Sequence, residues 1–420
     1  MTANQSLNLK IPIKLPKGAW LVVALLCVVG CLNYLDRVMI TTMRSSITDS
    51  LKINDAEFGL LTSVFLWVYG FLSPFAGFLA DKFKRSRVII VSLFVWSAVT
   101  YLTAHATTFN ELLLTRALMG LSEACYIPAA LALISDYHRG TTRSLATGLH
   151  MGGVMVGQSL GFAGGWIADK YHWTDAFGFF GIFGIIYSLV LIFFLKDVGE
   201  KNKDEVEDIV DKSEINFITG IKNLFKHRSF NLLLVFWALL GIVGWMLVGW
   251  LPTYYKEHFN LSQTLGGFYA TAYIYPMSFI GVILGGILAD RFSRKNPKGR
   301  VWVPAIGLCI AAPAIFLASS TDVVWITIIG FALYALTRTF SDTNLMPILC
   351  TIVDPRYRAT GYGVLNMFAC LVGGLGIYAS GALRDAHIDL SIMFKIAGLL
   401  MLICAFILYI LKINYQNKQA

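Results

Sequence analysis

The chain has 420 residues, of which 56% are hydrophobic and only 14% are charged, and its mean hydropathy is +0.65. A soluble protein of this length cannot bury so much apolar surface, so the composition excludes a soluble domain and indicates an integral membrane protein. The net charge of +9 follows from the loop charges described below and calls for no nucleic-acid partner.

Twelve apolar runs along the chain are long enough to cross a bilayer, which takes about 20 mostly apolar residues. They lie at roughly 19–41, 57–80, 88–105, 109–135, 144–168, 176–195, 230–255, 265–289, 301–319, 323–350, 359–383 and 390–412. We therefore expect an all-α protein with twelve transmembrane helices. The shallow break "SSTDV" between the ninth and tenth runs is the least sharp boundary.

The Lys and Arg residues predict that both termini are cytoplasmic. With that orientation, 25 of them lie in inner loops and tails, 5 in outer loops and 4 within spans. Positive charge is concentrated on the cytoplasmic side of membrane proteins, so this asymmetry supports the span count. We expect a multi-pass protein of a bacterial inner or plasma membrane, surrounded by lipid and working as a monomer.

An internal repeat divides the chain into halves. "GFLADKFKR" at Gly77–Arg85 recurs as "GILADRFSR" at Gly286–Arg294, each time at the end of the second helix of its half. The long polar segment 196–229 lies between the halves and ends in an amphipathic stretch suited to the membrane surface. We expect six-helix bundles at 1–195 and 230–420, joined by a cytoplasmic linker at 196–229.

The repeated loops also bring carboxylates next to cations. Carboxylate–guanidinium pairs at helix ends can latch neighbouring helices in one state and release them in another. The alternative is that these charges only set the topology. The predicted latch residues are Asp81, Arg85 and Arg87 in the first half and Asp290, Arg291 and Arg294 in the second.

The repeated motif resembles the loop between helices two and three of the major facilitator superfamily, although Lys84 and Ser293 replace a glycine of that pattern. The resemblance covers nearly the whole chain. It implies two six-helix bundles around a central cavity, which work by alternating access with substrate near the midplane.

Within that superfamily, several segments resemble the anion:cation symporters, which carry organic anions with protons. They are "NYLDR" at 33–37, "RALMGLSEACYIP" at 116–128, "GWLPTYY" at 249–255, "PMSFIGVILGG" at 276–286 and "LNMFACLVGG" at 365–374. The first two segments equally resemble Spinster-type lysolipid or sphingolipid carriers.

Four ionisable residues lie inside the first and fourth spans. An ionised residue at the bilayer centre costs roughly 2.5–3.5 kcal/mol on insertion scales, so such residues are functional candidates. Arg116 and Glu123 are seven residues apart and share a helix face, whereas the adjacent Asp36 and Arg37 point about 100° apart. We expect Asp36 to pair with Arg116, which leaves Arg37 to hold an anion through its fork of N–H donors.

Glu123 lies in an apolar helix, where its carboxyl could take up and release a proton. The resemblance to anion symporters implies the same roles: Asp36 and Glu123 as proton-coupling acids and Arg37 as the ligand of a substrate carboxylate. The alternative is that the four charges only hold the two helices together.

Other polar residues of the spans are weaker candidates. Arg338 and Asp342 are four residues apart and can pair along one face, with Arg338 either a second anion contact or merely neutralised. The remaining candidates for the cavity wall are Tyr34, His150, Gln158, Trp245, Tyr254, Tyr269, Tyr273, Asn344 and Asn366.

We predict a proton-coupled symporter of a small organic anion such as a sugar acid or another monocarboxylate. A Spinster-like carrier of lysolipids is the first alternative, and a receptor with a transporter fold the second. No nucleophile–base motif, phosphate loop or metal-ligand cluster points to an enzyme, and no cofactor is expected beyond the coupling protons.

Overall fold

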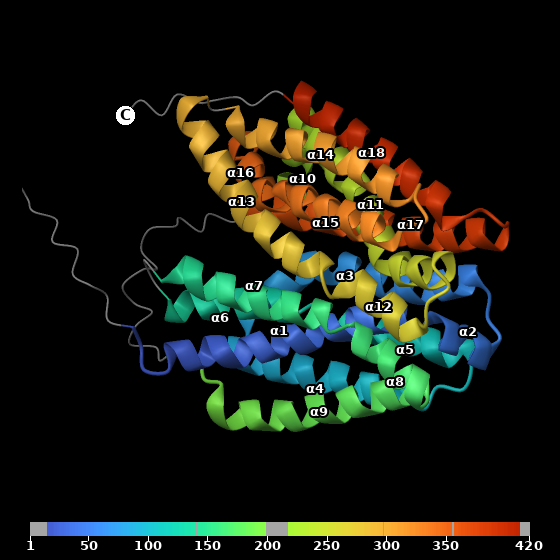
Figure 1. Cartoon of the computed structure of the whole chain (residues 1–420). Helices are drawn as coiled ribbons and strands as arrows, with labels where there is room; N and C mark the ends of the chain where they lie inside the picture. Colours follow the sequence, from blue (N-terminus) through green and yellow to red (C-terminus); the bar gives the residue numbers. More distant parts are fainter. Residues whose placement is uncertain (1–14, 139–141, 199–216, 297, 355–356, 412–420) are drawn as a thin grey trace, which may run out of the picture.

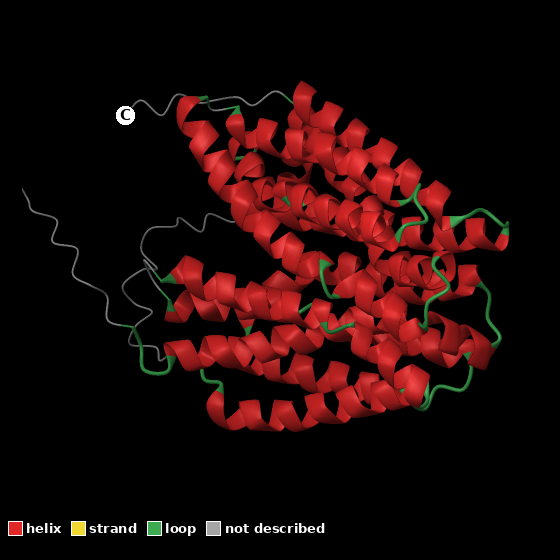
Figure 2. Cartoon of the chain, viewed as in Figure 1, coloured by secondary structure: helices red, strands yellow, loops and turns green. Residues whose placement is uncertain are grey.

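The computed structural model describes residues 15–138, 142–198, 217–296, 298–354 and 357–411, without the side chains at 77–81, 217–219, 295 and 359. Within these ranges, every regular element is a helix (Figure 2). The all-α membrane fold expected from the sequence is confirmed.

The helices of the first part of the chain lie together, in the lower part of Figure 1. They are α1 (Ala19–Thr42), α2 (Arg44–Leu51), α3 (Asp55–Lys82), α4 (Arg85–Thr103), α5 (Phe109–Glu123), α6 (Tyr126–Tyr137), α7 (Arg143–Ser159), α8 (Phe162–Lys170) and α9 (Trp173–Phe194).

The helices of the second part lie mostly above them in the same view. They are α10 (Phe217–Lys226), α11 (Arg228–His258), α12 (Gln263–Thr271), α13 (Ile274–Lys295), α14 (Gly299–Ala318), α15 (Val324–Arg338), α16 (Phe340–Ile352), α17 (Arg358–Asp385) and α18 (Leu390–Ile410).

Eleven candidate membrane spans are found in the described part of the chain, each long and apolar enough to cross a bilayer. The predicted fifth span, 144–168, is not among them, and it consists of α7 with 17 residues and α8 with 9. The count of twelve spans, the orientation of the termini and the boundaries 1–195, 196–229 and 230–420 stay predictions.

Four of the predicted spans are broken rather than continuous, between α5 and α6, α7 and α8, α12 and α13, and α15 and α16. Two of these breaks have a common cause. Pro128 and Pro276 are each the third residue of the second helix of their pair. Proline has no N–H group to donate to the carbonyl four residues earlier, and its ring clashes with that carbonyl. Those carbonyls belong to Ala124 and Ala272, where the first helix of each pair stops.

The two groups of helices meet most closely along α3 and α17. Ser63 Oγ donates to the carbonyl of Gly374 at 2.6 Å, and Trp67 Nε1 donates to the carbonyl of Leu371 at 3.0 Å. Side chains of α3 thus bond to the backbone of α17, which holds the two helices together. A second contact brings α12 beside α8, as Figure 1 shows.

Glycines allow α7 to lie directly on α1. A Cβ added at Gly157 would lie 2.0 Å from the carbonyl oxygen of Cys31, and one at Gly153 would lie 2.6 Å from that of Cys27. No larger residue fits at either position without a shift of the backbone, so this close approach depends on small residues.

Candidate functional site

Arg37 and Glu123 form a buried ion pair between α1 and α5. Arg37 Nε donates to Glu123 Oε2 at 2.6 Å, and the two side chains are 3% and 0% exposed. This corrects the expectation that Arg37 is unpaired. Helix α1 directs Arg37 toward the end of α5, so the last residue of that helix becomes its partner.

The expected pair of Asp36 with Arg116 is not formed. Asp36 Oδ2 lies 3.2 Å from Thr100 Oγ1, and Arg116 Nη1 lies 2.9 Å from Met119 Sδ, which is a weak acceptor. In the described part of the chain, Asp36 Oδ1 and the Nε and Nη2 atoms of Arg116 have no hydrogen-bond partner. Burial of such groups without a partner is costly, so these atoms are available to another hydrogen-bonding group.

Three aromatic rings surround the guanidinium of Arg37. Its Cζ lies 4.3 Å from the ring centroid of Tyr69, 4.6 Å from that of Tyr34 and 5.1 Å from that of Phe65. Such contacts stabilise a desolvated cation. Phe65 and Tyr69, which are four residues apart on α3, were not predicted from the sequence, because their spacing equally suits a packed helix face.

A cavity of about 310 Å³ lies between the two groups of helices. This volume is at the lower end of the range typical of small-molecule sites. Predicted site residues among its lining are Tyr34, Arg37, Gln158, Arg338, Asp342 and Asn366, together with Trp245. The structure therefore brings together residues from α1, α7, α11, α15, α16 and α17. Asp36, Arg116 and Glu123 are buried behind the wall rather than part of it.

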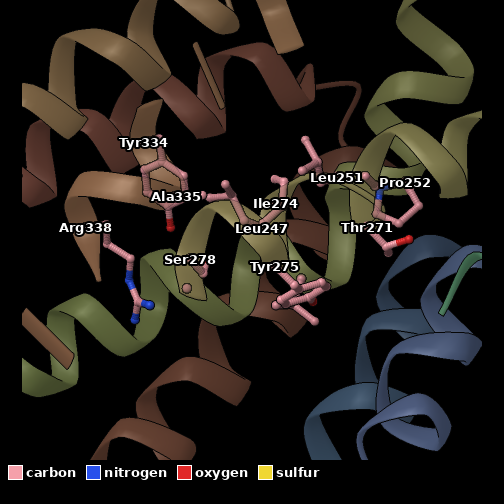
Figure 3. A pocket seen from close by; sticks show the side chains of 13 residues that line it. Leu247, Leu251, Pro252, Thr271, Ile274, Tyr275, Ser278, Tyr334, Ala335 and Arg338 are labelled. Carbon is pink, nitrogen blue, oxygen red and sulfur yellow. The ribbon is translucent and has the colours of Figure 1, made fainter. Parts of the chain in front are cut away.

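Arg338 and Asp342 contact each other across the break between α15 and α16. Arg338 Nη1 donates to Asp342 Oδ2 at 2.9 Å. Arg338 also borders a narrower pocket of about 70 Å³, which continues from the cavity past Tyr275, Ser278 and Tyr334. Figure 3 shows these side chains, with Leu247 and Leu251 of α11 and Ile274 of α13 among them.

Three residues expected in the cavity wall lie elsewhere. The hydroxyls of Tyr273 and Tyr255 are 2.5 Å apart, and the ring of Tyr269 packs 5.9 Å from that of Tyr255. Asn344 donates to the carbonyl of Phe340 at 2.8 Å and is 3% exposed. All three serve packing within the second group of helices, because the turn between α12 and α13 directs the tyrosines to α11.

Two weaker candidates are structural as well. His150 Nδ1 lies 3.2 Å from the carbonyl oxygen of Leu26, and its side chain is buried between α7 and α1. Tyr254 donates to the carbonyl of Ala318 at 3.3 Å and packs against Phe331 and Phe394.

Two of the predicted latch residues form ion pairs in the structure, and the latch itself stays a prediction. Arg85 binds Asp136 of α6, and Arg300 Nη2 donates to Asp290 Oδ1 at 3.1 Å. The basic side chains of Arg87, Arg291 and Arg294 are exposed, and the side chain of Asp81 lies outside the described residues. In both pairs the partner comes from a neighbouring helix, α6 for Arg85 and α14 for Asp290.

At the end of the molecule that is predicted to be outer, one ionic network joins the two groups of helices. We call it the outer network: Arg44, Asp55, Glu257, Arg384 and Asp385. Asp55 accepts from Arg44 and, at 2.8 Å, from Arg384 Nε, while Glu257 accepts from Arg44 at 3.2 Å and from Arg384 at 2.9 Å. The carboxylate of Asp385 accepts from the backbone N–H groups of Asp55 and Ala56.

The outer network was not predicted from the sequence, where Arg44 and Arg384 counted only as two of the five outer cations. The sequence did offer an indication, because Lys and Arg are rare in outer loops, and the few that occur there are candidates for a specific role. The network ties α2 and α3 to α11 and α17.

Membrane-spanning helices in two groups, with buried ionisable residues beside a cavity between them, define a multi-pass membrane transporter. The chain belongs to the Major Facilitator Superfamily, whose family model matches residues 26–377. Members of this family are transporters, not enzymes.

The relatives include Spinster proteins and a bacterial transporter. The chain is 27% identical over 398 residues to Protein spinster homolog 3 of Danio rerio, which covers 88% of this chain and 78% of that protein. It is 24% identical over 411 residues to the probable sulfoacetate transporter SauU of Cupriavidus necator, with 92% of each protein covered. The expected membership and the Spinster-like similarity are confirmed.

A solved structure shares the fold. The crystal structure of a bacterial homologue of the human lysosomal transporter Spinster, in an inward-facing and occupied conformation, matches with a TM-score of 0.73. Its sequence is 22% identical, and the match covers 94% of this chain and 96% of that one.

Proposed function

We propose that this protein is a secondary active transporter that carries a small organic anion together with protons, by alternating access. One observation carries the proposal: the guanidinium of Arg37 borders the central cavity while its Nε is bound by the carboxylate of Glu123. The cavity thus contains an anion-binding group whose present partner can be neutralised by a proton.

The coupling follows from competition for Arg37. An ionised Glu123 attracts the guanidinium and repels a substrate carboxylate that approaches it. Protonation of Glu123 removes both effects, so the anion binds more tightly when the proton is already bound. Release of one on the cytoplasmic side favours release of the other.

Asp36 and Arg116 are proposed as the second part of the same machinery. They lie on the two helices that carry Arg37 and Glu123, and each has a polar atom without a hydrogen-bond partner in the described part of the chain. When Glu123 leaves Arg37, Arg116 is a cation on its own helix that can bind it. Asp36 then serves as the second site for a proton.

The name of one relative agrees with an anionic substrate. The probable sulfoacetate transporter of Cupriavidus necator is named for a small organic anion. We propose the bacterial inner membrane as the location, because that relative and an efflux pump of Mycolicibacterium smegmatis are bacterial proteins. We further propose a monomer, with the substrate held between bundles at 1–195 and 230–420.

Uptake into proteoliposomes tests the proposal. Purified protein is reconstituted, and radiolabelled organic anions are added with and without an inward proton gradient. We expect accumulation of at least one small anion with the gradient and only equilibration without it. Accumulation that ignores the gradient would refute proton coupling, and no anion flux at all would refute the substrate class.

A Spinster-like carrier of lysolipids or similar amphiphiles is the second candidate. The cavity wall favours it through its apolar residues, which include Met151, Val154, Met155, Trp237 and Leu240. The same vesicles distinguish the two functions: exchange of a fluorescent lysolipid between leaflets, without uptake of any organic anion, would establish the amphiphile carrier.

A further inference from the structure

We propose that the substrate is a small dianion with an acidic group at each end, one bound by Arg37 and the other by Arg338. The inference rests on the proposed function and names its substrate class. It differs from the monocarboxylate suggested by the sequence, since the structure places two guanidinium groups at one cavity.

The two arginines are presented in the same way. Each is held by one carboxylate, Arg37 by Glu123 at 2.6 Å and Arg338 by Asp342 at 2.9 Å. Each also has an N–H group with no hydrogen-bond partner in the described part of the chain: Nη2 of Arg37 and Nε of Arg338. Buried donors of this kind are costly to leave unpaired, so both cations are suited to an added acceptor.

The arginines come from opposite sides of the cavity. Arg37 lies on α1 in the first group of helices, and Arg338 is the last residue of α15 in the second. A monoanion has only one acidic group to offer these two cations, so it satisfies fewer of their N–H groups. A dianion binds both and so connects the two groups that must move together when the cavity changes sides.

The size and lining of the cavity suit a short dianion. Its volume of about 310 Å³ is at the lower end of the range for small-molecule sites, which suits a small ligand. The wall also offers Gln158 as a polar group and Met155 and Trp245 as apolar surface. Ser278 and Tyr275 line both the cavity and the narrow pocket, and their hydroxyls can orient the second acidic group.

Binding to the purified full-length protein tests the proposal with matched ligands. The dianions are succinate and sulfoacetate, and the monoanions are succinamate, propionate and gluconate. Affinity is measured by calorimetry and by thermal stabilisation. We expect a dianion to bind at least tenfold tighter than every monoanion, and Arg338→Gln to weaken the binding of the dianion at least tenfold more than the binding of the monoanions.

Two further variants supply a second test and a control. Asp342→Asn removes the carboxylate that competes for Arg338, so we expect severalfold tighter binding of the dianion. Arg143→Gln, an exposed arginine at the start of α7, is the matched control and should change nothing. If the Arg338→Gln variant does not fold, the affinity of Asp342→Asn for the dianion tests the proposal by itself.

The outcomes separate the two proposals. Monoanions that bind as tightly as dianions, or that lose affinity equally in Arg338→Gln, would overturn the dianion while the anion transporter stands. Absence of binding by any anion in the panel would overturn both.

Discussion

Arg37 of α1 and Glu123 of α5 form an ion pair of 2.6 Å in which both side chains are almost completely buried. Glu123 is the last residue of its helix, and the chain turns at Ala124 and Cys125 before α6 begins. The carboxyl group of Glu123 therefore lies at a break in the fourth predicted span. The backbone can shift there with the loss of fewer hydrogen bonds than in the middle of a helix. Interrupted helices form the binding sites of many transporters.

Replacement of Glu123 should separate transport from the proton gradient. In Glu123→Gln the side chain is permanently neutral, so Arg37 is free for the anion without a proton. We expect accumulation in a proton gradient to fall at least tenfold, while exchange of labelled for unlabelled substrate across the membrane persists. Uptake and exchange assays in proteoliposomes measure both.

The matched control is Glu111→Gln on the same helix. Glu111 is exposed and belongs to a capping box with Thr108, in which glutamine serves as well as glutamate. If both variants kept full gradient-driven accumulation, Glu123 would not be a coupling residue.

Arg37→Lys should weaken substrate binding although it keeps the charge. Lysine cannot present the planar fork of donors that binds Glu123 and an incoming carboxylate, nor stack as guanidinium does between Tyr34 and Tyr69. Loss of a charge-assisted hydrogen bond is worth about 1.5–3 kcal/mol, or roughly a ten- to hundredfold loss of affinity. Calorimetry with the best anion checks this, with Arg143→Lys as control; an unchanged affinity would remove Arg37 from the substrate site.

Asp55→Asn should loosen the outer end of the molecule. Asp55 accepts from both Arg44 and Arg384, so its neutral amide weakens the connection of α2 and α3 to α17. Hydrogen-exchange mass spectrometry should show faster exchange over 44–51, with no change over 220–226 in α10. Asp49→Asn, an exposed residue of α2, is the control, and equal exchange in the two variants would contradict a connecting role for the outer network.

Gly157→Ala should destabilise the fold, whereas Gly152→Ala on the same helix should not. A methyl group at 157 would lie 2.0 Å from the carbonyl oxygen of Cys31, but one at 152 meets nothing within 4 Å. Overpacking of this kind costs about 1–3 kcal/mol, so the first variant should melt at a clearly lower temperature by intrinsic fluorescence. Similar melting of the two variants would show that α7 and α1 separate more easily than the structure indicates.

Transport should be electroneutral. Around the cavity, the described helices carry three carboxylates and three guanidinium groups: Asp36, Glu123, Asp342, Arg37, Arg116 and Arg338. A net charge is costly in this low-dielectric setting, so each negative charge of the substrate should enter with one proton. A potassium diffusion potential should then leave uptake unchanged at a constant pH gradient; a potential-driven rise would indicate a different stoichiometry.

Much of the fold follows from patterns that act locally. Runs of about 20 apolar residues identify eleven of the expected spans, because the bilayer requires that length of helix. The repeat at 77–85 and 286–294 and the motifs at 33–37 and 116–128 indicate the superfamily. Four interrupted spans were expected to be continuous, since hydropathy averages over a turn of one or two residues.

The sequence by itself determined that this protein spans a membrane, that it belongs to a transporter family and that its key charges lie on the first and fourth spans. Those properties depend on composition and spacing along one helix. Only the tertiary structure decided which groups pair. Arg37 pairs with Glu123, Arg85 with Asp136 and Asp290 with Arg300. The tertiary structure also placed a second guanidinium, that of Arg338, at the same cavity as Arg37. Partner choice depends on the rotation and depth of each helix relative to its neighbours, and tight packing at residues such as Gly157 sets both.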